Sequence, residues 1–534
     1  MAGNRAICLE VRHVLQTSSP FNRPSVRIGM AVAALATMVA GSVAATAGSH
    51  PKLTSYDADL SWMAGDHVAS SAYFDAARNL KLGNTPDGPC GPGSRPETSW
   101  QGRVPAKDYT DGRAAKGYTC NTAEVSHYGD SGGYRVARYV DKHGHVCGFY
   151  DSTLLFPTNV LSGDDAGTYV LDMSNPRKPV RTAVLQTPAM DTPHESLRLN
   201  SKRGLLVADA GSPATNLGFV DVYSVADDCR HPVFDATLPI GPFGHESGFS
   251  PDGRTFWATA TAREGITAID LTNPKLPTIV WHSEKYGSHG MAISPDGKRA
   301  YLAAPCCNYF TAISGYGNDS KTGGLVILDI SKVQNRTLTD PAEDLPVVAK
   351  LTWPEISIPQ NVIPITIKKH KYLVEFDEFS SNTLQYNPDS AVGAARIIDI
   401  QNDRHPKVIS RIRLAAQNPK ARNSDQQNDP GATSGTQGYA AHYCAVPRQN
   451  DPGIVACSMI LSGLRIFDIR DPYHPREVAY FNMPPSGGSH AMSAPAFDPA
   501  RGDIWYTDGA SGFWDVHVTN GVWRRSGSYP TPNF

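Results

Sequence analysis

One short segment recurs seven times in this chain of 534 residues, and this repeat constrains the fold more than any other feature. Each copy starts with Gly or Ala, continues with a short β-branched or aromatic run, and ends on a polar residue. The copies are Gly167–Asp172, Gly218–Tyr223, Gly265–Asp270, Gly324–Asp329, Ala394–Asp399, Gly463–Asp468 and Gly512–His517. The final residues of successive copies lie 51, 47, 59, 70, 69 and 49 positions apart. This period is typical of propeller blades, the longer units carrying insertions.

A second segment precedes most copies and consists of two apolar runs joined by a Pro-Asp-Gly turn, as in Gly244–Ala258 and Gly287–Leu302. Proline presets φ in such a turn and glycine accepts a positive φ, so the pattern predicts a hairpin. Each unit is then a four-stranded meander. No long window keeps a helical period, which argues against βαβ units or a helical solenoid. We therefore predict an all-β fold, a seven-bladed β-propeller with an N-terminal extended arm.

The segment Gly324–Ser331, with the sequence GLVILDIS, resembles the repeat of LVIVD-repeat propellers. The Ser-Pro-Asp-Gly segments at Ser250 and Ser294 resemble the related YVTN-type surface-layer repeats. The resemblance extends over about residues 125–530 and departs from the repeat at Tyr223 and His517, where Asp is expected. It implies a secreted β-propeller and assigns no reaction.

The N-terminus has the features of an export signal. Arg23 and Arg27 precede an apolar run, residues 28–47, that ends in the small-x-small motif Ala45-Thr46-Ala47. We predict a signal peptide over residues 1–47 and a secreted protein, with association with the cell envelope left open. The alternative is an uncleaved membrane anchor, because about 20 apolar residues can span a bilayer.

The remaining chain divides at the first repeat-like segment. Residues 48–124 match no repeat, and we expect them to form an irregular arm packed on a propeller of residues 125–534. The four long insertions between strands, among them Ala415–Gly438, are expected on one face of the propeller. There they can form binding loops, a lid or solvent-exposed loops of no specific function.

Eight of the nine cysteines follow the predicted signal peptide, an even number that favours disulfides in an exported protein. Cys444 and Cys457 flank the turn residues 449–453 symmetrically, so a hairpin sets them opposite each other. We predict a Cys444–Cys457 disulfide. The pairing of the other six cysteines is not determined by the sequence.

Five histidines occupy equivalent places near the starts of the predicted inner strands. They are His194, His245, His289, His442 and His490. The inner strand near Ile358–Asn361 departs from this pattern and carries Gln360 and Asn361 instead. The five imidazoles are expected to converge at one mouth of the central channel, where Glu195 and Glu246 can join them.

Imidazole is the commonest transition-metal ligand in proteins, so one hypothesis is a copper or zinc site. The ligand set that we favour is His194, His245 and His289, from consecutive blades, with Glu246 as a fourth. Two alternatives stay open: a polar channel without metal, and a purely structural role for a residue repeated by duplication. Glu375, Asp377 and Glu378 point to the same mouth, as oxygen ligands, a general base or a solvated strand end.

Composition excludes one function class. Lys+Arg total 49 and Asp+Glu total 51, so the chain lacks the basic field of a nucleic-acid binder. A binding module for a small molecule, a peptide or a cell-envelope component is the first hypothesis. The alternative is a copper- or zinc-dependent enzyme, an oxidoreductase before a hydrolase or lyase. Association with a membrane is expected only if the signal segment stays uncleaved and acts as an anchor.

Overall fold

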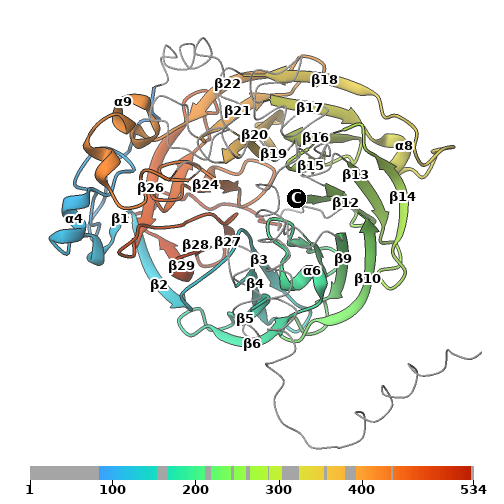
Figure 1. Ribbon diagram of the computed structural model, residues 1–534, viewed down its shortest axis with the longest axis horizontal. Helices are drawn as coiled ribbons and strands as arrows, with labels where there is room; N and C mark the ends of the chain where they lie inside the picture. The colour runs from blue at the N-terminus through green and yellow to red at the C-terminus, as the bar shows by residue number, and fades with distance from the viewer. Residues whose placement is uncertain are drawn as a thin grey trace, which may run out of the picture.

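The computed structural model describes residues 83–152, 166–210, 218–241, 246–259, 265–286, 288–303, 324–353, 358–378, 393–434 and 437–530. Its strands form seven sheets arranged in a ring, six of four strands and one extended by a fifth (Figure 1). The first strands of neighbouring sheets contact one another around the central channel. The chain is therefore a seven-bladed β-propeller, as the repeat predicts.

Each of the first four blades in chain order is an antiparallel meander whose first strand is innermost. The first contains β3 (Val136–Val140), β4 (Val146–Asp151), β5 (Thr168–Asp172) and β6 (Val180–Leu185). The second blade follows the short α6 (Pro188–Asp191). It contains β7 (Arg198–Asn200), β8 (Leu205–Asp209), β9 (Gly218–Ser224) and β10 (Val233–Gly241). The third contains β11 (Ser247–Phe249), β12 (Thr255–Thr259), β13 (Ile266–Asp270) and β14 (Thr278–Ser283). The fourth contains β15 (Met291–Ile293), β16 (Arg299–Ala303), β17 (Gly324–Asp329) and β18 (Val347–Thr352), with α8 (Ser331–Gln334) between the last two.

The last three blades include the strands that close the ring. The fifth contains β19 (Ile358–Ile367), β20 (His370–Glu378), β21 (Ala395–Asp399) and β22 (Lys407–Ile412). The sixth contains β23 (Tyr443–Ala445), β24 (Ile454–Ser458), β25 (Leu464–Asp468), β26 (Arg476–Asn482) and, outermost, β1 (Tyr118–Cys120). The seventh contains β27 (Ala496–Asp498), β28 (Asp503–Asp508), β29 (Gly512–Val518) and β2 (Thr122–Tyr128).

The sevenfold repeat forms the third strand of every blade, and its terminal Asp has a structural task. Asp172, Asp270 and Asp329 each accept a hydrogen bond from the backbone N–H two residues further on. Asp399 and Asp468 do the same. This local bond starts the turn to the outer strand, as Asx turns do. The Pro-Asp-Gly turns also form as expected, with φ near +70° at Gly253 and Gly297.

The ring is closed by the N-terminal part of the chain. Strand β2 pairs antiparallel with β29, so the seventh blade joins both ends of the propeller. Strand β1 pairs with β26 and extends the sixth blade. Two short helices precede them, α4 (Ala106–Thr110) and η2 (Ala114–Lys116). A closed ring removes the free sheet edges that an open propeller leaves.

Buried ion pairs fasten the arm to the sixth blade. Arg465 of β25 is fully buried and pairs with Glu97 of the arm and with Glu477 of β26, at 3.1 Å for Glu477. Arg103 pairs with Asp429 at 2.7 Å. Asp429 lies within the insertion Ala415–Gly438, for which a lid or a solvent-exposed loop of no specific function is expected. That insertion holds η4 (Ala415–Gln417), α9 (Pro419–Arg422) and η5 (Asp425–Asn428), and it packs against the arm.

Three disulfides cross-link the described residues: Cys90–Cys120, Cys147–Cys229 and Cys444–Cys457. The predicted Cys444–Cys457 bridge is confirmed, since the two residues face each other across β23 and β24 with Cα atoms 3.9 Å apart. Cys306 and Cys307 lie outside the described residues. The disulfides indicate an oxidising setting.

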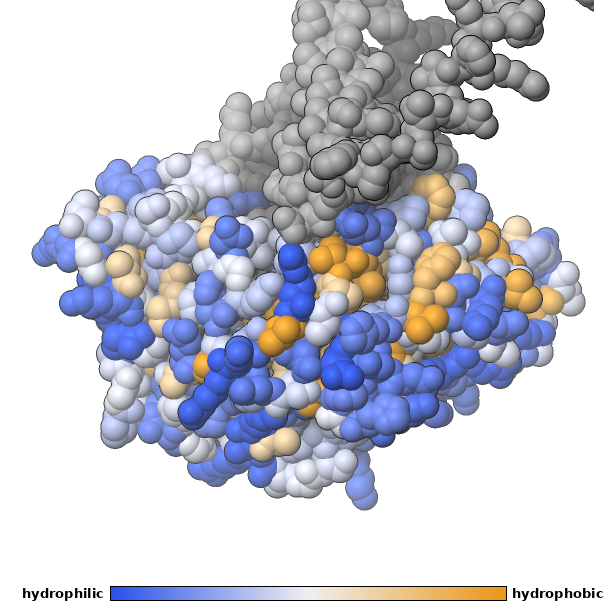
Figure 2. Space-filling view, turned by 90° about the horizontal axis from the view of Figure 1, so that it is seen from below, coloured by the Kyte–Doolittle hydropathy of each residue, from blue (hydrophilic) through white to orange (hydrophobic). Residues whose placement is uncertain are grey.

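The apolar core lies between neighbouring blades rather than in one central mass. Trp257 and Trp281 of the third blade, for example, share a cluster with Met291 and Leu302 of the fourth. Hydrophilic residues cover most of the described surface in the view of Figure 2, with apolar residues in small separate groups. Among the described helices, none is long and apolar enough to cross a membrane.

Candidate functional site

Four titratable side chains meet at one end of the central channel. Glu195 precedes β7, His289 precedes β15, Glu378 ends β20 and His442 precedes β23. Each is at most 4 % exposed. We refer to these four residues as the channel tetrad. They come from the second, fourth, fifth and sixth blades, so the tetrad links blades on opposite sides of the ring.

The two imidazoles and the two carboxylates alternate around the tetrad. His289 Nε2 lies 3.4 Å from Glu195 Oε2 and 3.3 Å from Glu378 Oε1. His442 Nε2 lies 3.1 Å from Glu195 Oε1 and 2.9 Å from Glu378 Oε2. Ligand atoms of Glu195, His289 and Glu378 all lie within 4.8 Å of one another, close enough to share a metal ion.

The outer nitrogens of both rings are fixed by backbone carbonyls. His289 Nδ1 lies 3.2 Å from the Pro359 carbonyl oxygen, and His442 Nδ1 lies 2.6 Å from that of Met492. A carbonyl only accepts, so each Nδ1 carries a proton and donates it. Each Nε2 then faces the carboxylates as a lone pair in the neutral ring or as a second N–H in the imidazolium.

Charge and burial oppose each other in setting the pKa of the histidines. Burial lowers the pKa of His442, but hydrogen bonds and charge from Glu195 and Glu378 outweigh it and raise the pKa to about 9. The pKa of His289 is raised in the same way, burial being outweighed by the charges of Glu378 and Glu195. Without a cation between the carboxylates, His442 therefore favours the imidazolium form at neutral pH, and the pKa of His289 is shifted in the same direction.

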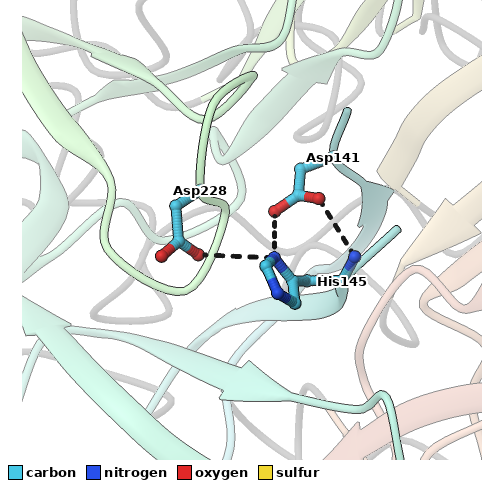
Figure 3. A group of neighbouring side chains, drawn as sticks. All are labelled: Asp141, His145 and Asp228. Carbon is cyan, nitrogen blue, oxygen red and sulfur yellow. Dashed lines mark hydrogen bonds and ion pairs between the residues drawn. The ribbon is translucent and has the colours of Figure 1, made fainter. Parts of the chain in front are cut away.

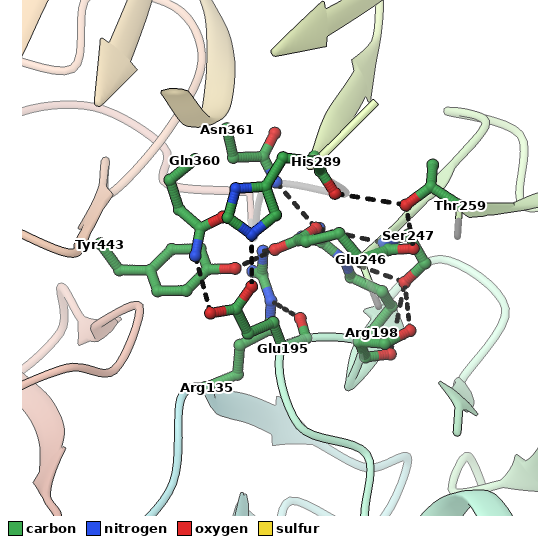
Figure 4. A network of polar contacts seen from close by, with 12 residues as sticks. Arg135, Glu195, Arg198, Glu246, Ser247, Thr259, His289, Gln360, Asn361 and Tyr443 are labelled. Atoms are coloured by element: carbon green, nitrogen blue, oxygen red, sulfur yellow. Dashed lines mark hydrogen bonds and ion pairs between the residues drawn. The ribbon is translucent and has the colours of Figure 1, made fainter. Parts of the chain in front are cut away.

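Gln360 and Tyr134 complete the surroundings of the tetrad. Gln360 Nε2 donates to Glu195 Oε1 at 2.7 Å, and its Oε1 has no hydrogen-bond partner among the described residues. The ring of Tyr134 packs between His194 and His442, with centroids 4.4 and 5.1 Å away. Figure 4 shows Gln360, Glu195 and His289 converging from their separate blades.

A second polar layer lies next to the tetrad and centres on Glu246. Its carboxylate receives hydrogen bonds from Arg135, at 2.7 Å, and from Arg198. Asn361 Nδ2 donates at 2.9 Å and the Tyr443 hydroxyl also donates (Figure 4). Arg135 Nε in turn donates to the backbone carbonyl of Glu195, which joins the two layers.

The structure brings together two of the five predicted histidines. His289 and His442 are in the tetrad, whereas His194 packs edge-on against Tyr134. His490 is half-buried beside Asp508, which accepts a hydrogen bond from its backbone N–H. His245 lies outside the described residues.

Two details of the sequence-based ligand set differ from the structure. Glu246 lies in the second layer, not with the histidines, because both of its carboxylate oxygens are held by arginine, asparagine and tyrosine donors. The converging histidines also come from the fourth and sixth blades rather than from consecutive ones. Two glutamates that reach across the channel join them.

Sequence reasoning undervalued Glu378 and Gln360. The signal for Gln360 was its place where the other inner strands carry His. Glu378 ends the second strand of the same blade, whose acidic run also includes Glu375 and Asp377. These two carboxylates pair with the buried Arg396 instead of reaching the tetrad.

A second cluster with metal-binding residue types lies away from the channel, at Asp141, His145 and Asp228 (Figure 3). Asp141 accepts hydrogen bonds from the backbone N–H groups of His143, His145 and Cys229, and its Oδ2 lies 2.8 Å from His145 Nδ1. These donors lower the pKa of Asp141 although burial alone would raise it. The cluster clamps two loops beside the Cys147–Cys229 disulfide, a structural role.

No protein-family model and no curated protein matches the chain. Among solved structures, hydrazine synthase of Kuenenia stuttgartiensis is 14 % identical with a TM-score of 0.46, covering 74 % of this chain and 97 % of that one. A putative 6-phosphogluconolactonase of Bacteroides uniformis is 11 % identical with a TM-score of 0.45, covering 68 % and 88 %. The C-terminal WD40 domain of Sif2 is 9 % identical with a TM-score of 0.43, covering 74 % and 98 %.

At these identities and TM-scores the similarities carry no functional inference. The fold assignment rests on the seven sheets of this chain, and the resemblance to LVIVD-repeat propellers rests on the repeat residues alone. The fold and the site together define a seven-bladed β-propeller with a buried histidine–glutamate cluster in its channel.

Proposed function

We propose that the channel tetrad binds one divalent transition-metal ion, zinc or copper, and that the ion cross-links the blades of a secreted binding module. The observation that carries this proposal is the orientation of the two histidines. Both turn Nε2 toward two carboxylates while a backbone carbonyl holds Nδ1. Metal-ligating histidines are oriented by this kind of outer hydrogen bond.

The spacing of the donor atoms supports a shared metal site. Ligands about 2.0–2.1 Å from a zinc ion are about 3.3 Å apart in a tetrahedral site. His289 Nε2 lies 3.4 Å from Glu195 Oε2 and 3.3 Å from Glu378 Oε1, and His442 Nε2 faces the other oxygen of each carboxylate at 3.1 and 2.9 Å. Two imidazole nitrogens and two carboxylate oxygens suit zinc and Cu(II).

Electrostatics supports the same proposal. Two buried carboxylates need two positive charges nearby, and a divalent ion supplies both while leaving the histidines neutral. Without the ion, protonation of the imidazoles is the remaining source of positive charge in the tetrad, and the pKa values of both histidines are raised. Because the ligand residues are buried and come from separate blades, a cross-linking ion fits better than a catalytic one, which keeps a position open for water or substrate. The oxidoreductase alternative requires such a position.

Metal analysis of the purified protein tests the site. Protein produced with supplied zinc and copper, then dialysed, is expected to hold about one ion per chain. The variant H289A/H442A removes both nitrogen donors and is expected to hold none. The matched control H490A removes a histidine outside the tetrad and should keep the ion. A metal-free wild type, or equal metal content in wild type and H289A/H442A, contradicts the proposal.

We also propose that the protein is exported and cleaved after Ala47. The Ala45-Thr46-Ala47 motif and the three disulfides support this proposal. N-terminal sequencing of protein recovered from the medium should begin at Gly48. Retention of the apolar segment in a membrane fraction would instead favour the anchor.

A further inference from the structure

The part of the channel beyond the Glu246 layer contains a cavity of about 120 Å³. Polar and apolar atoms contribute about equally to its walls, which come mainly from the first two strands of several blades. The apolar side chains include Leu197, Leu199, Met291, Ile363, Phe376 and Ala445. Tyr529, near the C-terminal end of the described chain, also lines it. A cavity that combines apolar side chains with a few convergent polar groups is typical of a small-molecule site.

The polar end of this cavity is formed by two buried arginines, Arg135 and Arg198, which are 9 % and 3 % exposed. Both donate to the same carboxylate, that of Glu246. Two guanidinium groups therefore share one carboxylate, and this layer carries one excess positive charge. The third arginine of the wall, Arg138, pairs with Asp498 at 3.2 Å, a carboxylate that also pairs with Arg501.

Each of the two arginines uses only two of its three nitrogen groups for hydrogen bonds. Arg198 uses Nη2 for Glu246 and Nε for Ser247, and Arg135 uses Nη2 for Glu246 and Nε for the Glu195 carbonyl. The Nη1 group of each arginine has no hydrogen-bond partner among the described residues. Burial, and after it the neighbouring Arg135 charge, lower the pKa of Arg198 to about 10, whereas the charge of Glu246 outweighs burial and raises the pKa of Arg135.

We propose that this cavity binds a small organic carboxylate, with the carboxylate on the Nη1 groups of Arg135 and Arg198 and the apolar part against the inner strands. A carboxylate supplies the second negative charge that the arginine pair lacks, and its planar oxygens match guanidinium donors. The pocket is separated from the tetrad by Glu246, Tyr443 and Asn361, so this proposal goes beyond the metal site.

Calorimetric titration with benzoate tests the proposal, and benzamide, a neutral molecule of the same shape, is the matched ligand control. Wild-type protein is expected to bind benzoate at least about tenfold more tightly than benzamide, because the amide offers the guanidinium donors one acceptor oxygen and no negative charge. R198Q should weaken benzoate binding at least about tenfold. R177Q, which removes an arginine outside the pocket, should leave it unchanged.

Two further measurements keep the result decisive. A445L fills the cavity without touching the arginines and should abolish benzoate binding even if R198Q folds poorly. Metal content should be equal in wild type and A445L, which separates this proposal from the metal site. Absence of benzoate binding at millimolar concentrations, equal affinity for benzoate and benzamide, or unchanged affinity in A445L would overturn the proposal.

Discussion

Replacing Arg465 with methionine is expected to lower the free energy of unfolding by about 3–5 kcal/mol. Arg465 is fully buried and is the cation that Glu97 and Glu477 share. Even with Arg465 present, burial raises the pKa of Glu477 to about 6, the guanidinium opposing the shift. Without the guanidinium, two buried carboxylates lose their counter-charge. The ion pair between Glu97 of the arm and Arg465 of the sixth blade is lost as well.

Arg470 provides a matched control five positions away in the same blade. It pairs with Asp468 in an exposed turn, with 47 % of its side chain accessible. R470M should therefore cost less than about 1 kcal/mol. Urea denaturation followed by tryptophan fluorescence measures both variants. Equal losses in R465M and R470M would show that the buried triad contributes no more than a surface pair.

The stability of metal-free protein should fall as the pH rises from about 6.5 to above 9. His442 has a pKa near 6.5 in the unfolded chain and about 9 in the folded one. A group with a raised folded pKa stabilises the fold fully below its unfolded pKa, and this contribution is lost as the pH rises through the folded pKa. For His442 the contribution amounts to about 3 kcal/mol.

Comparison with H442Q isolates this contribution from those of other titrating groups. In chelator, the difference in unfolding free energy between wild type and H442Q should shrink by about 3 kcal/mol between pH 6.5 and 10. H490Q is the control, since burial lowers the pKa of His490 and no such loss is expected in this range. A difference that stays constant with pH would contradict the imidazolium form of the metal-free tetrad. With metal bound, the loss should move to acid pH, because protons then compete with the ion.

Much of the architecture follows from local sequence. A segment such as Gly265–Asp270 carries its own strand propensity and its own turn, because Asp270 bonds the backbone N–H two residues away. Seven copies therefore specify seven third strands before any long-range contact forms. The Cys444–Cys457 bridge is local in the same sense, since the turn between the two residues fixes their register.

Which residues form the site depends on contacts between parts of the chain that are far apart in the sequence. Repetition located His289 and His442 at equivalent strand starts, but it did not reveal which histidines turn into the channel. Glu378 reaches the tetrad from the end of a second strand, a position with no counterpart in the histidine pattern. Arg135 immediately precedes the inner strand of a blade that lacks the repeated histidine, so nothing in the repeat predicted that it would bind Glu246 together with Arg198.

The sequence by itself thus determined the number of blades, the position of their third strands and one disulfide, because each depends on residues within a few positions of one another. Only the tertiary structure decided that His289 and His442 share two glutamates and that Glu246 belongs to an arginine layer. Side chains from blades on opposite sides of a ring meet only after the ring has closed. Which of them then pair is set by burial and charge in the channel, to which all the blades contribute at once.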